Sequence, residues 1–222
     1  MIIFPGGTED EAPERVKGGD ITVAPVDTAG FSNLPRLLLH CCCAPCASYA
    51  LEYLSPDYNI TILFYNPNIR PPEEFEKRLA AVKTLLEAAD YPNRVDLIAV
   101  DHDASAFELA AGPYRLEPEG GKRCGVCFGL RLEETAARAA SGGYDCFATT
   151  LTVSPHKPAA VINEIGGALE EKYAVSYLPS DFKKRDGYKR SIELSKQYGL
   201  YRQSYCGCLM GERKNDAESE RP

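Results

Sequence analysis

Residues 36–54 read RLLLHCCCAPCASYALEYL, and this stretch decides the fold. Its first five residues form a short apolar run that predicts a buried strand, and residues 45–54 predict the helix that follows. Three cysteines lie between the two elements, and a fourth, Cys46, lies in the first turn of the predicted helix. In open parallel sheets ligands bind beyond the carboxyl ends of the strands, so we expect chemistry at this point of the chain.

The alternation of strand and helix continues along the chain. Pro72, followed by Glu73 and Glu74, is typical of a helix start. Strands separated by helices favour a parallel sheet covered on both faces. We therefore predict an α/β fold: a Rossmann-like, mostly parallel sheet of about five strands with helices on both faces. The predicted strands are 36–40, 58–65, 94–100, 144–149 and 174–178, and the predicted helices are 45–54, 72–88, 104–110, 124–140, 158–172 and 188–198.

Length and composition predict one domain with two tails. The chain has 222 residues, with 44% hydrophobic and 26% charged residues, which is ordinary for a globular protein. Residues 1–34 are interpreted as a flexible N-terminal extension, 35–210 as a single α/β catalytic domain, and 211–222 as a charged C-terminal tail. No apolar run approaches the roughly 18 residues of a membrane span, and no secretion signal is apparent, so we expect a cytoplasmic protein.

Nine cysteines in a cytoplasmic protein indicate metal binding or redox chemistry rather than structural disulfides. Seven of the nine form three tight groups: Cys42, Cys43 and Cys46; Cys124 and Cys127; and Cys206 and Cys208. Of the other two, Cys41 adjoins the first group, and Cys146, alone in an apolar stretch, is interpreted as a small buried core residue.

Three kinds of cysteine site fit these spacings. A CxxC at a helix start, such as Cys43 to Cys46, is found in thioredoxin-like thiol exchangers. Two separated CxxC pairs also suit a structural zinc ion. Neighbouring cysteines, however, reach two adjacent metals of an iron–sulfur cluster more easily than one zinc ion, so Cys42 beside Cys43 favours a cluster. The Cys206-Gly-Cys208 pair suits either a strained, easily reduced disulfide or further metal ligands.

Charge is unevenly distributed. The net charge of −7 does not indicate nucleic-acid binding by itself. Between Asp181 and Arg202, however, seven basic residues stand against three acidic ones. This segment is explained equally well as an RNA contact or as a solvated helix face.

Six motifs taken together resemble one known family, that of the epoxyqueuosine reductase QueH. The resemblance runs in order from about Arg36 to Leu209, although the family does not require a cysteine at Cys41. The motifs are His40-x-Cys-Cys-Ala-Pro-Cys46, Phe64-Tyr-Asn-Pro-Asn-Ile69, Glu119-Gly-Gly-Lys-Arg-Cys-x-x-Cys127, Thr149-Thr-Leu-Thr-x-Ser-Pro-His-Lys157, Leu178-Pro-Ser-Asp-Phe-Lys183 and Gly199-Leu-Tyr-Arg-Gln-x-Tyr-Cys-Gly-Cys208.

The resemblance implies an activity and a cofactor. Members reduce the epoxide of epoxyqueuosine at the wobble position of tRNA, the last step of queuosine synthesis, without cobalamin. By resemblance, a 4Fe-4S cluster is held by Cys42, Cys43, Cys124 and Cys127, and Cys206 with Cys208 forms a redox-active pair. Cys46 and Asp181 are placed next to the cluster, around an additional iron ion.

The expected partners are tRNA carrying epoxyqueuosine and an unidentified electron donor, with no membrane contact. His40, His156 or Tyr205 is the expected proton donor. A zinc-binding RNA-recognition scaffold and a thioredoxin-like oxidoreductase remain the alternatives. The residues expected to contact RNA are Lys183, Lys184, Arg185, Lys189, Arg190, Tyr201 and Arg202.

Overall fold

The structure is a computed structural model and describes residues 33–208. The predicted C-terminal tail and nearly all of the predicted N-terminal extension lie outside the described residues. Within residues 33–208, no helix is long and apolar enough to cross a membrane. In chain order the elements are β1 Arg36–His40, α1 Ala44–Leu54, β2 Asn59–Phe64, α2 Pro72–Ala88, β3 Val95–Ala99, α3 Ser105–Ala111, the 3-10 turn η1 Gly112–Tyr114, α4 Lys122–Ser141, β4 Cys146–Thr149, the 3-10 turn η2 Thr150–Val153, α5 Ala159–Tyr173, β5 Ser176–Tyr177 and α6 Gly187–Gln197.

The five strands form one parallel sheet in the order β3-β2-β1-β4-β5. From β1 the chain builds outward through β2 and β3, and it then continues on the other side of β1 with β4 and β5. The strand order therefore reverses between β1 and β4, where parallel α/β sheets bind their ligands. The predicted fold class is confirmed.

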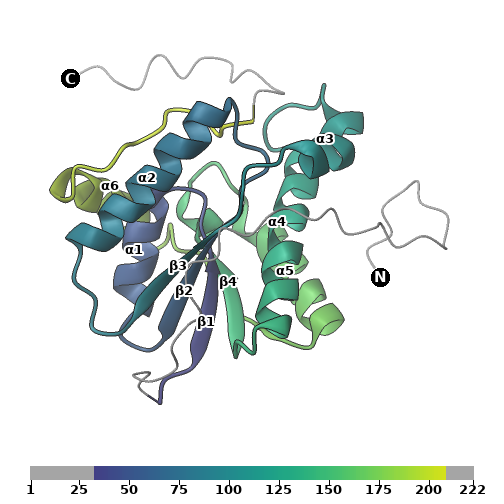
Figure 1. The fold of residues 1–222 in the computed structure, drawn as a ribbon. Helices are drawn as coiled ribbons and strands as arrows, with labels where there is room; N and C mark the ends of the chain where they lie inside the picture. Colours follow the sequence, from purple (N-terminus) through teal and green to yellow (C-terminus); the bar gives the residue numbers. More distant parts are fainter. Residues whose placement is uncertain (1–32, 209–222) are drawn as a thin grey trace.

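Helices cover both faces of the sheet, with α1, α2 and α6 on one side and α3, α4 and α5 on the other (Figure 1). Successive side chains of a strand point to opposite faces, so β1 contributes to both cores. Leu37 and Leu39 pack in the core that includes residues of α1 and α2, while Leu38 packs with Phe128 of α4. All three leucines are fully buried, so β1 is the centre of the molecule.

Four of the five strands are shorter than the sequence indicated: β2 and β3 lose one residue at each end, and β4 and β5 differ more. β4 begins at Cys146 rather than at Tyr144, because the N–H of Tyr144 donates to the carbonyl oxygen of Ala139 and so completes the end of α4. The fifth strand, predicted over 174–178, contains only Ser176 and Tyr177. Ala174, at the left-handed φ of 51°, ends α5, and Pro179, which has no N–H for a sheet ladder, follows directly.

Candidate active site

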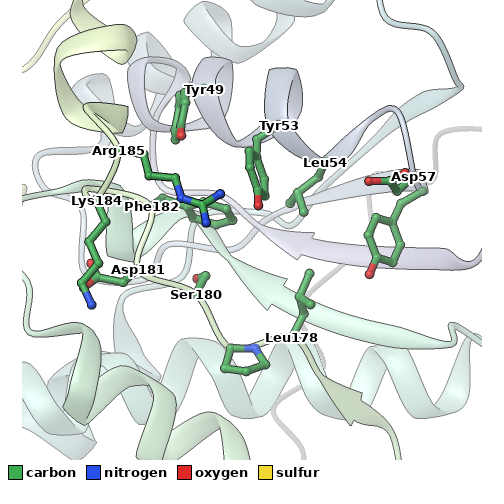
Figure 2. Close-up of a pocket in the computed structure, with 12 residues that line it drawn as sticks. Tyr49, Tyr53, Leu54, Asp57, Leu178, Ser180, Asp181, Phe182, Lys184 and Arg185 are labelled. Atoms are coloured by element: carbon green, nitrogen blue, oxygen red, sulfur yellow. The ribbon is translucent and has the colours of Figure 1, made fainter.

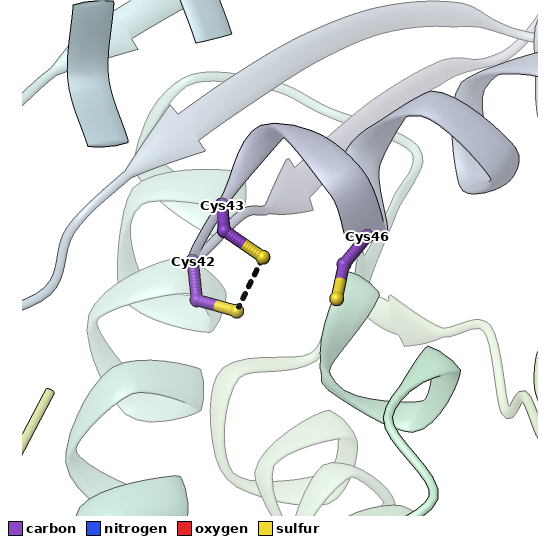
Figure 3. Close-up of side chains that lie close together, drawn as sticks. All are labelled: Cys42, Cys43 and Cys46. Carbon is purple, nitrogen blue, oxygen red and sulfur yellow. Dashed lines mark hydrogen bonds between the residues drawn. The ribbon is translucent and has the colours of Figure 1, made fainter. Parts of the chain in front are cut away.

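Three sulfur atoms meet directly after β1, at the point where the strand order reverses. The Sγ atoms of Cys42, Cys43 and Cys46 all lie within 4.8 Å of one another, and those of Cys42 and Cys43 are 3.8 Å apart (Figure 3). Cys43 is the extended residue that precedes α1, and Cys46 follows in the first turn of this helix. Pro45 suits that first turn, where a backbone N–H has no helical partner. We call these residues the three-thiol group.

The thiols of this group differ in acidity. Hydrogen bonds with Cys43 and Cys46 lower the pKa of Cys42 well below its usual value, although burial opposes this. The contact with Cys42 in turn raises the pKa of Cys43 to about 11 and raises that of Cys46 as well. The geometry thus favours one thiolate, at Cys42, with two neutral thiols beside it.

The second cysteine pair lies at the start of α4. Cys124 accepts a hydrogen bond of 3.2 Å from the backbone N–H of Gly120, and it packs against the same buried cluster as two members of the three-thiol group. Cys127, one turn later, is buried, with Cys208 packed beside it, and burial raises its pKa to about 12. Chain segments more than 60 residues apart therefore bring all three predicted cysteine groups to one region.

Buried positive charge accompanies the cysteines. Arg131 of α4 is 2% exposed, and its Nη2 has no hydrogen-bond partner among the described residues. Burial lowers the pKa of Arg131, but the electrostatic interactions with the nearby Cys127, Cys42 and Cys206 outweigh this and raise it. The pKa of the partly buried Lys157 is likewise lowered by burial and raised overall by Cys42 and Cys206. These cations face cysteines of every group.

The residues present fit a metal centre. Thiolates are soft ligands that select iron–sulfur clusters and zinc. An isolated buried guanidinium is unfavourable unless negative charge faces it, and Arg131 has no carboxylate among its contacts in residues 33–208. A thiolate-bound metal centre would supply that negative charge. The buried cysteine cluster therefore has the donor atoms, the burial and the surrounding charge of a site that could hold a metal ion.

Asp181, predicted as a further ligand, lies in the loop between β5 and α6. Its carboxylate forms ion pairs with Lys183 at 2.7 Å and Lys184 at 3.5 Å. The bond with Lys183 lowers the pKa of Asp181. In residues 33–208 Asp181 is not part of the three-thiol group, so its role as an iron ligand stays a prediction.

Arg78 of α2 holds the backbone of the Cys206-Gly-Cys208 segment. Its Nη1 donates to the carbonyl oxygen of Cys206 at 3.0 Å, and its Nη2 donates to that of Tyr205 at 3.1 Å. Gly207 adopts a φ of 101°, and a Cβ built on it would lie 3.1 Å from Arg78 Nη2. The arginine therefore sets the path of the segment that carries both cysteines.

A buried carboxylate orients Arg78 in turn. Glu74, one turn earlier on α2, pairs with the Nε of Arg78 at 2.7 Å, and the two side chains are only 6% and 2% exposed. The other oxygen of Glu74 accepts a hydrogen bond of 2.8 Å from Tyr201. Tyr201 was predicted to contact RNA, and here its hydroxyl group completes a buried network behind the cysteine pair.

His40 ends β1 with both ring nitrogens in hydrogen bonds. Nδ1 lies 2.9 Å from the hydroxyl of Thr149, and Nε2 lies 3.2 Å from the carbonyl oxygen of Tyr65. A carbonyl only accepts, so Nε2 carries the proton and the hydroxyl donates to Nδ1. Burial lowers the pKa of His40 to about 3, which favours a neutral ring that joins three strand ends. His156 is exposed. The assignment of either histidine as proton donor stays a prediction.

The residues predicted to contact RNA lie in different environments. Lys184, Arg185 and Lys189 are exposed. Arg190 instead forms ion pairs with Glu52 at 2.7 Å and with Glu193 at 3.1 Å. The remaining members make internal contacts: Lys183 with Asp181, Tyr201 with Glu74 and Arg202 with Ser195.

No role was assigned from the sequence to the cations Arg78 and Arg131, which are buried, or to Lys157, which is partly buried. A signal was present for two of them. Arg78 follows Glu74 by four residues on the predicted second helix, and Arg131 follows Cys127 by four residues. This spacing places both members of each pair on one helix face. That these charges are buried and face sulfur depends on the tertiary structure alone.

Comparison with known proteins identifies the family of this chain. The family model described as epoxyqueuosine reductase QueH matches residues 37–214. Proteins of that name from Streptococcus pyogenes serotype M1 and Staphylococcus epidermidis are 43% and 44% identical, over 79% and 81% of this chain and 69% and 77% of theirs. One from Thermotoga maritima is 36% identical over 83% of this chain and 96% of its own length. The chain therefore belongs to the epoxyqueuosine reductase QueH family.

Proposed function

We propose that this chain reduces the epoxide of epoxyqueuosine in tRNA with a 4Fe-4S cluster held by Cys42, Cys43, Cys124 and Cys127. Epoxyqueuosine reduction is the activity of the family, and it makes the protein an oxidoreductase acting on tRNA. The observation that carries the cofactor proposal is the three-thiol group together with the buried guanidinium of Arg131, whose Nη2 has no hydrogen-bond partner among the described residues.

The residues divide into ligands and electron carriers. An iron–sulfur cluster, when bound, supplies electron transfer and Lewis acidity. Cys46 and Asp181 would hold the additional iron ion, because thiolate and carboxylate both ligate iron. Arg131 and Lys157 stabilise the negative charge of the thiolates that they face.

Cys206 and Cys208 would supply the reducing equivalents. Reduction of the epoxide to an alkene consumes two electrons and two protons, and the oxygen leaves as water. Oxidation of the two thiols to one disulfide releases two electrons and two protons, which balances the reaction. An external electron donor then reduces the disulfide. A strained C-x-C disulfide suits this cycle because it is easily reduced.

Binding of tRNA would use the exposed basic residues Lys184, Arg185 and Lys189, and His40 or His156 remains a candidate proton donor. A tRNA substrate is consistent with a cytoplasmic protein. We take residues 35–210 as the single catalytic domain. A truncated chain of these residues should retain iron and activity.

The decisive experiment is anaerobic purification with iron, sulfide and zinc analysis of the wild type, Cys124→Ala and Cys146→Ala. We expect about four irons and four sulfides per chain, the content of a cubane cluster. Cys124→Ala should lose them and Cys146→Ala should not. A fifth iron that disappears in Asp181→Ala supports the additional site. A colourless wild type that holds zinc overturns the cofactor proposal and favours the RNA-recognition scaffold.

The electron-carrier role has its own test. The Cys206→Ala/Cys208→Ala variant should keep its iron and sulfide but should no longer turn epoxyqueuosine into queuosine. Activity at the wild-type rate in this variant would show that the pair does not supply the electrons.

A further inference from the structure

A pocket of about 400 Å³ lies between α1 and the loop that joins β5 to α6. Ligand sites in proteins begin at about this size. Tyr49 and Tyr53 of α1 form one wall, and Phe182 and Arg185 of the loop form another (Figure 2). We call this the tyrosine pocket. It is separate from the three-thiol group, whose residues do not line it.

The aromatic wall is held in place by its neighbours. Tyr53 and Phe182 meet edge to face, with ring centroids 5.9 Å apart, and Tyr49 contacts both rings at 6.2 and 6.3 Å. Gly187 begins α6 where a Cβ would lie 2.3 Å from the Tyr49 ring, so that ring is fixed against the backbone. Tyr53 is 50% exposed. A rigid aromatic ring with an open side offers a stacking surface.

The tyrosine pocket is lined by the carboxylates Asp57 and Asp181 and by the cations Lys184 and Arg185, so an anion fits it at Arg185. The guanidinium of Arg185 extends over the pocket toward Tyr53 and Phe182 (Figure 2). Arg185 forms no ion pair within residues 33–208, whereas nearby Arg190 is paired twice. The side chain of Lys184 is 78% exposed at the same rim. Lys184 is paired with Asp181 at 3.5 Å, so Arg185 is the cation that remains available to a ligand. Aromatic rings next to a positively charged side chain are the combination with which proteins bind single-stranded nucleic acid.

The tyrosine pocket lies close to the sulfur site. Tyr49 and Tyr53 follow Cys46 by three and seven residues on α1. At 1.5 Å per residue, their positions lie roughly 5 and 10 Å farther along the helix axis. The loop on the other side of the pocket carries Asp181. A ligand here would sit beside a substrate at the sulfur atoms and would not displace it.

We propose that the tyrosine pocket binds an unpaired nucleotide of the tRNA anticodon loop, a neighbour of the one being reduced, with its base stacked on Tyr53 and its phosphate on Arg185. This inference rests on the proposed tRNA substrate. In this arrangement the enzyme binds the anticodon loop next to the reacting nucleotide. This contact helps to hold the reacting nucleotide out of its base stack. Any base can stack on tyrosine, so this contact adds affinity with little sequence preference.

The test uses the full-length protein, purified anaerobically, and a synthetic anticodon stem-loop RNA. Two versions of the RNA carry 2-aminopurine on one side or the other of the wobble nucleotide. The dissociation constant is measured for the wild type and for Tyr53→Ala, Tyr53→Phe and Arg185→Gln, at several salt concentrations. Lys77→Gln, which removes an exposed charge of α2 outside the pocket, is the control.

We expect Tyr53→Ala to weaken binding about tenfold, since loss of one base–aromatic stack has about this effect. Tyr53→Phe keeps the ring and should bind as the wild type does. Arg185→Gln should reduce the slope of log affinity against log salt by about 0.7, the value for one phosphate contact on a single strand. One 2-aminopurine should change its fluorescence on binding to the wild type and not to Tyr53→Ala. Lys77→Gln should change none of these quantities.

Three results would overturn the inference in different ways. If the wild type binds the stem-loop and reduces tRNA while Tyr53→Ala and Arg185→Gln bind normally, the pocket is not the nucleotide site and the proposed function stands. A lower steady-state rate in those variants at unchanged RNA affinity would assign the pocket to the electron donor instead. If the wild type binds no RNA, the proposed function fails together with the inference.

Discussion

Variants of Arg78 should show how much this buried side chain contributes to the free energy of unfolding and how much to the rate of catalysis. The ion pair between Glu74 and Arg78 is almost fully buried, and the guanidinium also serves two carbonyl oxygens of the 205–206 segment. Removal of one member of a buried pair leaves the other charged and unpaired, at a cost of about 3–5 kcal/mol. We expect Arg78→Met to lower the free energy of unfolding by this amount.

The chain offers a matched control. Glu134 and Arg138 of α4 form a pair with the same spacing and nearly the same length, 2.6 Å against 2.7 Å, but these side chains are 34% and 30% exposed. Helix-surface pairs of this kind contribute only about 0.3–0.5 kcal/mol. Arg138→Met should therefore be nearly as stable as the wild type, and the difference between the two variants measures the effect of burial.

A double variant isolates the catalytic role. Glu74→Leu/Arg78→Met has no unpaired buried charge, so it should recover part of the lost stability. It still cannot hold the carbonyl oxygens of Tyr205 and Cys206. Because misplacement of a reacting group by about 1 Å can lower a rate on the order of 100-fold, the variant should remain slow. Urea unfolding followed by circular dichroism and single-turnover reduction of epoxyqueuosine tRNA measure the two effects.

Two outcomes would refute this reasoning. If Arg78→Met unfolds at nearly the same urea concentration as Arg138→Met, the burial of the pair has no energetic consequence. If the double variant regains both stability and the full rate, the hydrogen bonds from Arg78 to the 205–206 segment do not position the cysteines for catalysis.

Three further predictions concern a glycine, a cysteine and a histidine. Gly207 has a φ of 101° and lies against Arg78, whereas Gly120 has a φ of 90° and open space around its Cβ position. Gly207→Ala should therefore lower the melting temperature more than Gly120→Ala. Equal losses would mean that Arg78 exerts no steric constraint. Cys146→Ser should leave iron content and reductase rate unchanged, since burial raises the pKa of this thiol to about 11 and it lies outside the three-thiol group; a loss of iron would make it a ligand. Burial lowers the pKa of His40 to about 3 in the folded protein, against about 6.5 in the unfolded chain. Below about pH 6.5 the unfolded state therefore binds more protons at His40 than the folded state does. The free energy of unfolding should fall as the pH drops from 7 to 5. The NMR signal of its ring should remain that of neutral imidazole down to pH 5, and a titration midpoint above 5 would contradict the buried, doubly bonded ring.

Much of the fold was predictable because its signals are local. The helix 72–88 was predicted with the bounds that the structure gives to α2, since proline and acidic residues at its start and a regular apolar spacing are all properties of one segment. The strands at 36–40 and 58–65 were also predictable, because the apolar run that indicates each of them is a property of one segment. The fifth strand was predicted too long, because the left-handed conformation of Ala174 is not visible in its residue type.

Features of the active site were likewise predictable where they belong to one segment of the sequence. The cysteine groups, their order after the strands and the six motifs are properties of the sequence, and they sufficed to predict the fold class, the family and the reductase activity. The expectation of metal chemistry also comes from residue types, because thiolates are ligands that select soft metals.

Only the tertiary structure decided which side chains face the sulfur atoms. Arg78, Arg131 and Lys157 read as ordinary surface charges in the sequence, yet the fold places them around the cysteines, with Arg131 and Arg78 almost fully buried. The same is true of the tyrosine pocket, whose two walls are more than 120 residues apart in the chain. Local patterns record the backbone preferences of one segment at a time. Burial and the pairing of charges arise when several segments pack together, so their consequences for pKa and binding are settled only in the folded chain.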